Sequence, residues 1–88
     1  MARVIRARDV DAVLAYSGYG PSEFVDGEWE PGYRVGQDGR RRVNVFHDGP
    51  GEADRLEVYR LELQAAGFCV IPEQQEDGGR RRLGVTAG

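Results

Sequence analysis

The chain has 88 residues, with 12 basic and 15 acidic side chains and a net charge of −3 at pH 7. Leu, Ile, Val and Phe supply 20 of the 88 residues, just above the level below which a charged chain usually stays disordered. Burial in so short a chain barely offsets the entropy of ordering, so an oligomer would help. We therefore expect one small folded domain that spans residues 1–88.

The composition excludes several classes of protein. No apolar run approaches the roughly 18 to 20 residues of a membrane helix, and the arginine-rich start lacks the apolar segment of a signal peptide, so we expect a cytoplasmic chain. One cysteine, Cys69, and one histidine, His47, cannot supply an internal disulfide or a structural zinc site. We expect no metal and no cofactor. All 12 basic residues are arginine, a bias that indicates a GC-rich, bacterial genome.

A short helix is expected near the start of the chain, over residues 10–17. Asp9 is a typical N-cap residue for it, and its apolar side chains would face the core. Val4 and Ile5 in front of it form a candidate strand. Further on, Asp-Gly steps predict two hairpins: residues 33–36 with 40–46, and residues 70–73 with 82–86.

The strongest helix signal covers residues 53–66. One apolar stripe repeats at the helical period and consists of Leu56, Tyr59, Leu63 and Ala66. Gly67 followed by Phe68 predicts a Schellman end, with Gly67 in the left-handed conformation. A second apolar stripe lies on nearly the opposite side and consists of Val58, Leu61 and Ala65. Two apolar sides indicate a helix held between layers or buried in an interface.

β-branched and aromatic segments flank this helix and are expected to be strands, at residues 42–47 and 68–71. Strand, helix and strand in about 30 residues predict a βαβ unit whose two strands run parallel, as neighbours or apart.

The two halves of the chain resemble each other. DGRRRVNV at 38–45 matches DGGRRRLGV at 77–85, and Leu14, Gly18 and Tyr19 have the spacing of Leu63, Gly67 and Phe68; coincidence is the alternative in so arginine-rich a chain. The predicted fold class is an α+β two-layer sandwich of tandem αββ units, with two helices on one face of a four- to five-stranded sheet. If Val4 and Ile5 form a strand, the order becomes ferredoxin-like, βαββαβ, with an added C-terminal strand.

Two arginine triplets are the first candidate site: Arg40, Arg41 and Arg42, and Arg80, Arg81 and Arg82. Arginine forks fit phosphate bidentately, so opposed arginine hairpins could bind a nucleic acid. The acidic chain and the scarcity of strand aromatics favour instead edge positions where the arginines bond to carboxylates. Nucleic-acid binding is therefore the alternative function.

Two other positions could carry chemistry. His47 and Asp48 precede a glycine-rich turn, but strand neighbours point to opposite faces, and neither a P-loop spacing nor a nearby serine nucleophile is present. Cys69 is expected to be buried on the core face of its strand rather than to act as a nucleophile. We expect no enzymatic activity.

The first repeat holds an extra segment at residues 20–31, which carries Phe24 and Trp29 among four acids. An exposed aromatic in a polar rim is typical of an interface hot spot. Alternatively the two rings fold back over an edge of the core, which the shortage of large hydrophobic residues favours. The acids could contact an arginine hairpin of a second copy in an isologous dimer.

The leading functional prediction is a small non-enzymatic protein-interaction or accessory, regulatory module, in the simplest case a homodimer. Its expected binding surface combines the Phe24 and Trp29 segment with the second stripe of the long helix: Val58, Leu61 and Ala65. Neither a membrane nor a metal is expected as a partner.

Overall fold

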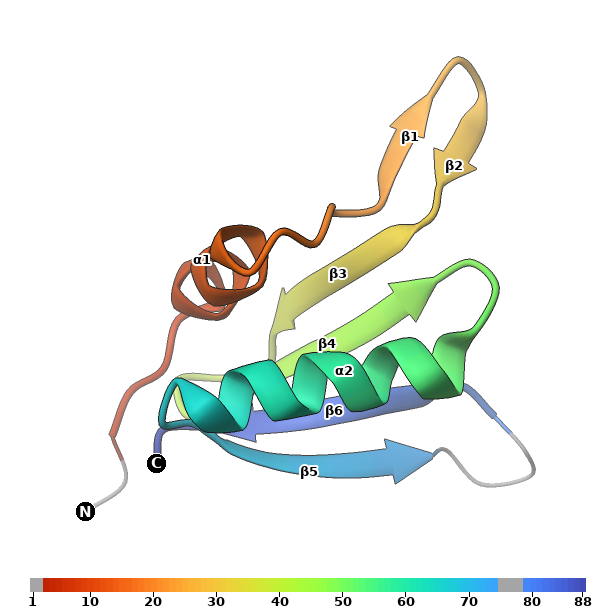
Figure 1. Cartoon of the computed structure of the whole chain (residues 1–88). Coiled ribbons are helices and arrows are strands. Elements are labelled where there is room, and N and C mark those ends of the chain that lie inside the picture. The colour runs from red at the N-terminus through yellow and green to blue at the C-terminus, as the bar shows by residue number, and fades with distance from the viewer. Residues whose placement is uncertain (1–2, 75–78) are drawn as a thin grey trace.

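The computed structural model describes residues 3–74 and 79–88 and has two layers, helices over a sheet (Figure 1). The elements in chain order are α1 (Ala7–Tyr16), β1 (Glu23–Val25), β2 (Glu28–Glu30), β3 (Gly32–Gln37), β4 (Val43–Asp48), α2 (Glu52–Ala65), β5 (Cys69–Gln74) and β6 (Arg81–Thr86). Strands β3 to β6 form an antiparallel sheet of order β3-β4-β6-β5, and β1 pairs only with β2. The predicted α+β sandwich is confirmed.

The two strands around α2 run parallel but are not neighbours. β6 lies between β4 and β5 and is antiparallel to both. The candidate strand at Val4 and Ile5 does not form, because only a single backbone bond, from the Ile5 N–H to the Arg40 carbonyl at 3.0 Å, ties it to the sheet before α1 begins. The ferredoxin-like order is therefore not found.

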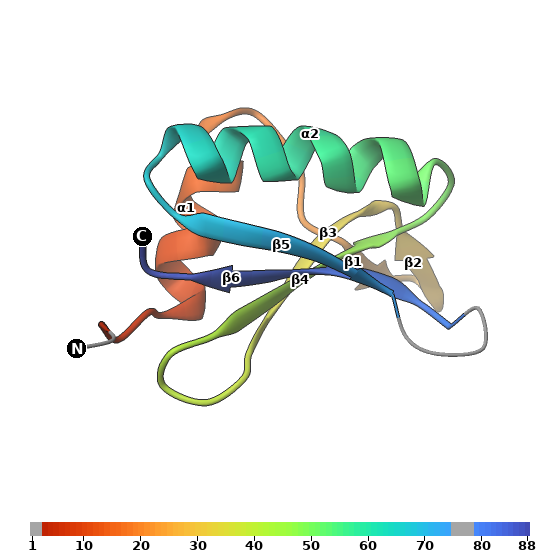
Figure 2. The ribbon, with the colours of Figure 1, turned by 90° about the horizontal axis from the view of Figure 1, so that it is seen from below.

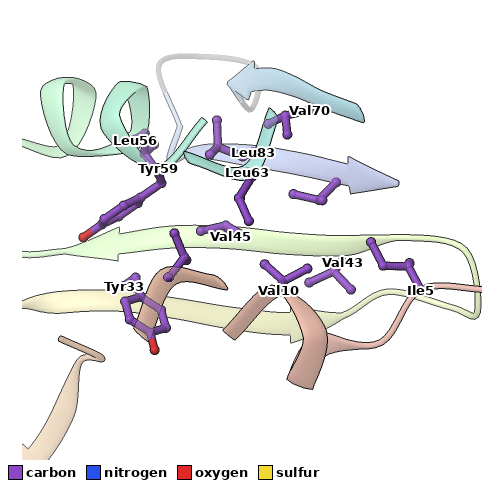
Figure 3. Packing of buried hydrophobic residues seen from close by; sticks show 12 residues of the cluster. Ile5, Val10, Tyr33, Val43, Val45, Leu56, Tyr59, Leu63, Val70 and Leu83 are labelled. Atoms are coloured by element: carbon purple, nitrogen blue, oxygen red, sulfur yellow. The ribbon is translucent and has the colours of Figure 1, made fainter. Parts of the chain in front are cut away.

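The core lies between the helices and one face of the sheet (Figure 3). Alternate positions of the central strands point into it and are fully buried: Val43, Val45, Leu83 and Val85. Leu14 of α1 and Leu63 of α2 belong to the same core cluster on the helix side and are also fully buried. The opposite face of the sheet, which no helix covers (Figure 2), is called the helix-free face below.

The two halves share their helix ends and their central register. Gly18 and Gly67 follow the two helices with φ of 93° and 98°, and the next residue in each case donates its N–H to the equivalent leucine carbonyl at 3.1 Å. The predicted Schellman end is confirmed and occurs twice. Asn44 of β4 faces Gly84 of β6, so a local twofold axis passes through this pair, at positions that the sequence match also equates.

Three local predictions are wrong. α1 begins at Ala7, and Asp9 lies in its first turn instead of capping it, because the Ala7 N–H donates to the Gln37 Oε1 at 2.7 Å. Phe24 and Trp29 do not fold back over the core, as described below. Cys69 is exposed, because Val70 takes the core side of β5 and its neighbour must point to the helix-free face. Part of the expected turn at 77–79 lies outside the described residues.

Candidate functional site

Strands β1 and β2 form a hairpin that projects beyond the end of β3 (Figure 1). Asp26 and Gly27 connect the strands with φ of 51° and 83°. Two consecutive positive φ values are the mark of a type I′ turn, for which Asp-Gly is a preferred pair. The sequence reasoning used this signal at residues 38–39 but missed it here, and so described an insertion without strands.

The hairpin has two chemically different faces. Phe24 faces Trp29 across the ladder, with ring centroids 5.4 Å apart, and each side chain is 62 % exposed. We call this pair the aromatic face. Strand alternation places the sequence neighbours of the two rings on the opposite face of the hairpin: Glu23, Val25, Glu28 and Glu30. Both rings stay outside the core cluster because the hairpin pairs only with itself.

The aromatic face adjoins the helix-free face of the sheet. Trp29 lines a hollow together with Arg34, Asp48, Gly49 and Arg80. Arg34 and Asp48 occupy the helix-free positions of β3 and β4, since their neighbours Tyr33 and His47 point into the core. The hollow therefore joins the exposed tryptophan to a charged part of the sheet.

Arg34 and Arg80 each contact both Phe46 and Asp48 in this region. Their guanidinium carbons lie 4.6 Å and 5.6 Å from the ring centroid of Phe46, and both donate to the Asp48 carboxylate, Arg34 Nε at 3.0 Å. Burial raises the pKa of Asp48, but hydrogen bonds from Arg80, Arg34 and Ser22 outweigh it and bring the pKa down to about 2. Asp48 is thus ionised at neutral pH.

A second ion cluster crosses the centre of the helix-free face. Arg42 reaches over Gly84 to donate to Glu73, which also accepts from Arg82 Nε at 3.2 Å. A Cβ at Gly84 would lie 2.7 Å from Arg42 Nη2, so any other residue there would displace the flexible end of Arg42 from this crossing. The Arg42 hydrogen bond, against the effect of burial, lowers the pKa of Glu73.

The structure brings only one arginine of each triplet together, since Arg42 and Arg82 both donate to Glu73. β4 and β6 are antiparallel, so the first arginines of the two triplets, Arg40 and Arg80, lie at opposite ends of the sheet. Three of the arginines pair with carboxylates: Arg42, Arg80 and Arg82. Three others are exposed: Arg40, Arg41 and Arg81. The triplets therefore do not form one pair of cationic ridges.

His47 lies in the core, away from Asp48. The Pro50 carbonyl, 3.2 Å from His47 Nε2, can only accept, so Nε2 donates to it, and Nδ1 lies 2.9 Å from the Tyr59 hydroxyl. His47 is 5 % exposed, and its strand neighbour Asp48 points to the helix-free face. The two side chains do not form an acid–base pair.

The second stripe of α2 is found on the outer surface of the helix layer. Val58 is half-buried, Leu61 is 54 % exposed and Ala65 is exposed. The core side of α2 carries Leu56, Tyr59 and Leu63, as predicted, whereas Ala66, the fourth member of the predicted stripe, is exposed at the C-cap. The stripe and the aromatic face therefore lie on different sides of the molecule, and the structure does not join them into one surface.

Comparisons with known proteins add no family. Neither a protein-family model, nor a curated protein, nor a solved structure has a significant match to the chain. Within residues 3–74 and 79–88, no three His, Cys, Asp or Glu side chains gather closely enough to hold a metal ion. In the same part of the chain, α1 and α2 both fall short of the length and apolarity of a membrane-crossing helix.

Proposed function

We propose that this chain is a protein-interaction module whose docking element is the β1–β2 hairpin. The observation that carries the proposal is the aromatic face, in which Phe24 and Trp29 stay largely in water on a projecting element. A ring of this kind buries about 150 to 250 Å² when it is fully covered, so covering the exposed part of each is worth roughly 2 to 4 kcal/mol.

The surroundings of the aromatic face also favour a protein partner. Tryptophan is enriched among the residues that dominate binding energy, and such residues work best inside a polar rim. The Arg34–Asp48 pair supplies such a rim beside Trp29. Because this ion pair and Phe46 are already fixed, a partner would lose little entropy in ordering that wall of the hollow.

Nucleic-acid binding by both triplets has less support. Arg42, Arg80 and Arg82 would have to exchange their carboxylates for phosphates. The first arginines of the triplets, Arg40 and Arg80, lie at opposite ends of the sheet.

Photo-cross-linking in cells of the native host tests the proposal. A photoreactive phenylalanine analogue replaces Trp29 in one variant and Tyr16, an exposed residue on α1, in the matched control. We expect a protein adduct of one defined mass from position 29 only, reduced when Phe24→Ala is added. Equal adducts from both positions, no adduct, or a nucleic-acid adduct would refute the proposal.

A further inference from the structure

A second surface gathers arginines at the end of β3 opposite to the hairpin. Two come from the start of α1 and two from the turn between β3 and β4, and together they are called the basic end: Arg6, Arg8, Arg40 and Arg41. Gln37 holds the two segments together, because its Nε2 donates to the Ile5 carbonyl at 2.8 Å and the Gly39 carbonyl at 2.7 Å. Arg6 and Arg40 line one hollow between them.

The charge of the basic end is not balanced locally. All four side chains are exposed and form no ion pair with the residues that the structure describes. Two acids lie close to the basic end in the sequence, and neither pairs with its four arginines. Asp38 pairs instead with Arg42, at 3.6 Å, and Asp9 forms no ion pair with the residues that the structure describes. Arg6 and Arg8 also sit at the positive end of the α1 dipole, where a cation is unfavourable. An unfavourable placement of charge that the fold does not need is typical of a functional surface.

The hairpin carries the opposite charge. Its acids are all exposed, form no ion pair with other described residues, and are called the acidic arm: Glu23, Asp26, Glu28 and Glu30. The hairpin precedes Gly32 and the arginine turn follows Gln37, so the two charged elements lie at opposite ends of β3, as Figures 1 and 2 both show. They cannot meet within one copy.

We propose that the acidic arm of one copy docks on the basic end of a second copy. Because the two elements lie at opposite ends of one strand, two copies laid antiparallel make both contacts at once and close a twofold dimer. Four acids match four arginines, whereas the net charge of −3 opposes the approach of a nucleic acid. The dimer deepens the proposed function, since it uses the acidic side of the same hairpin.

Light scattering of the purified chain tests the dimer. At an ionic strength of about 0.01 M, where the screening length is about 30 Å, we expect twice the mass of the chain. At about 1 M, where it is about 3 Å, we expect the mass of one chain. A single-chain mass at low salt, a dimer that persists at high salt, or a mass that grows beyond two copies would overturn the proposal.

Charge reversal identifies the contact. An arm variant carries Glu28→Arg and Glu30→Arg, and an end variant carries Arg40→Glu and Arg41→Glu. We expect each to be a monomer alone at low salt, since the two reversed charges cancel the two that remain and leave the changed element neutral. When the two are mixed, the unchanged basic end of the arm variant can still bind the unchanged acidic arm of the end variant, so we expect a heterodimer. Arg55→Glu with Arg81→Glu, exposed residues outside both surfaces, gives the end variant's charge change and should leave the dimer intact.

The ultraviolet absorbance ratio of the protein peak in the light-scattering experiment shows whether a nucleic acid is bound. Nucleic acid that elutes with the chain at low salt and leaves at high salt would assign the basic end to a polyanion and overturn the proposal. The proposed dimer and the proposed function can be refuted independently of each other. A chain without a salt-sensitive dimer can still give the cross-link from position 29, and a dimer can form when no cross-link is seen.

Discussion

Replacing Asp48 with asparagine tests the ion cluster that supports the hollow beside Trp29. Asp48 accepts hydrogen bonds from Arg34 Nε at 3.0 Å, from Ser22 Oγ at 2.7 Å and from Arg80, and its side chain is 18 % exposed. These bonds outweigh the effect of burial and lower the pKa of Asp48 from 3.8 to about 2.

The size of the effect follows from this pKa. Each unit of pKa difference between the folded and the unfolded state is worth about 1.4 kcal/mol, so the full shift corresponds to about 2.5 kcal/mol. The side chains of Arg34 and Arg80 are 44 % and 39 % exposed, and solvent screening reduces what they contribute. We therefore expect Asp48→Asn to lower the free energy of unfolding by about 1 to 2 kcal/mol at pH 7.

The pH dependence gives the sharper check. Because the pKa is lower in the folded state, the stabilisation is complete above pH 3.8 and is lost as the pH falls towards about 2. Urea unfolding followed by far-ultraviolet circular dichroism should show the difference between wild type and Asp48→Asn closing over this range. Asp54→Asn, at an exposed acid outside both proposed surfaces and without a described ion pair, is the control and should change the free energy of unfolding by less than about 1 kcal/mol. If the difference in the free energy of unfolding between wild type and Asp48→Asn is the same at pH 7 as near pH 2, the ionic explanation is refuted.

Three further changes test the fold around the two proposed surfaces. Gln37→Ala should cost about 1 to 2 kcal/mol, because it removes the acceptor of the Ala7 N–H, and faster amide exchange in the first turn of α1 would show it; unchanged protection would contradict this role. Leu63→Ala should lower the free energy of unfolding by about 2 to 5 kcal/mol, measured in urea, because its side chain is fully buried; a loss below about 1 kcal/mol would contradict the packing. The Cys69 thiol should be alkylated in the native protein as fast as in urea, and strong protection would contradict its exposed position.

The parts of the fold that the sequence predicted depend on local signals. The stripe of α2, its Gly67 end and the strands on either side each lie within a few consecutive residues. The start of α1 was wrong because its cap comes from Gln37, 30 residues away. The predicted burial of Cys69 was wrong because it relied on the average tendency of cysteine to be buried. Val70 takes the core side of β5, so strand alternation turns Cys69 to the opposite face.

The candidate surfaces were predicted less well than the fold, since they depend on contacts between distant residues. Nothing in an arginine triplet distinguishes Arg42, which Glu73 neutralises from another strand, from Arg40, which stays exposed. The two basic segments at residues 6–8 and 40–41 are far apart in the sequence, and only the folded chain shows that they meet, through hydrogen bonds from Ile5 to Arg40 and from Gln37 to Ile5. The choice between exposed and folded-back rings for Phe24 and Trp29 needed the register of β1 and β2.

The local twofold symmetry also shows where the two halves of the chain differ. Val35 faces Val45 in the first hairpin as Val70 faces Val85 in the second, so Val35 and Val70 are equivalent. Val70 follows the capping Phe68 by two positions, whereas Val35 follows the capping Tyr19 by sixteen. The added residues include the whole β1–β2 hairpin. Both the aromatic face and the acidic arm therefore lie in the segment that the symmetric scaffold does not need for its own packing, which is where a binding function can be added at least cost to the fold.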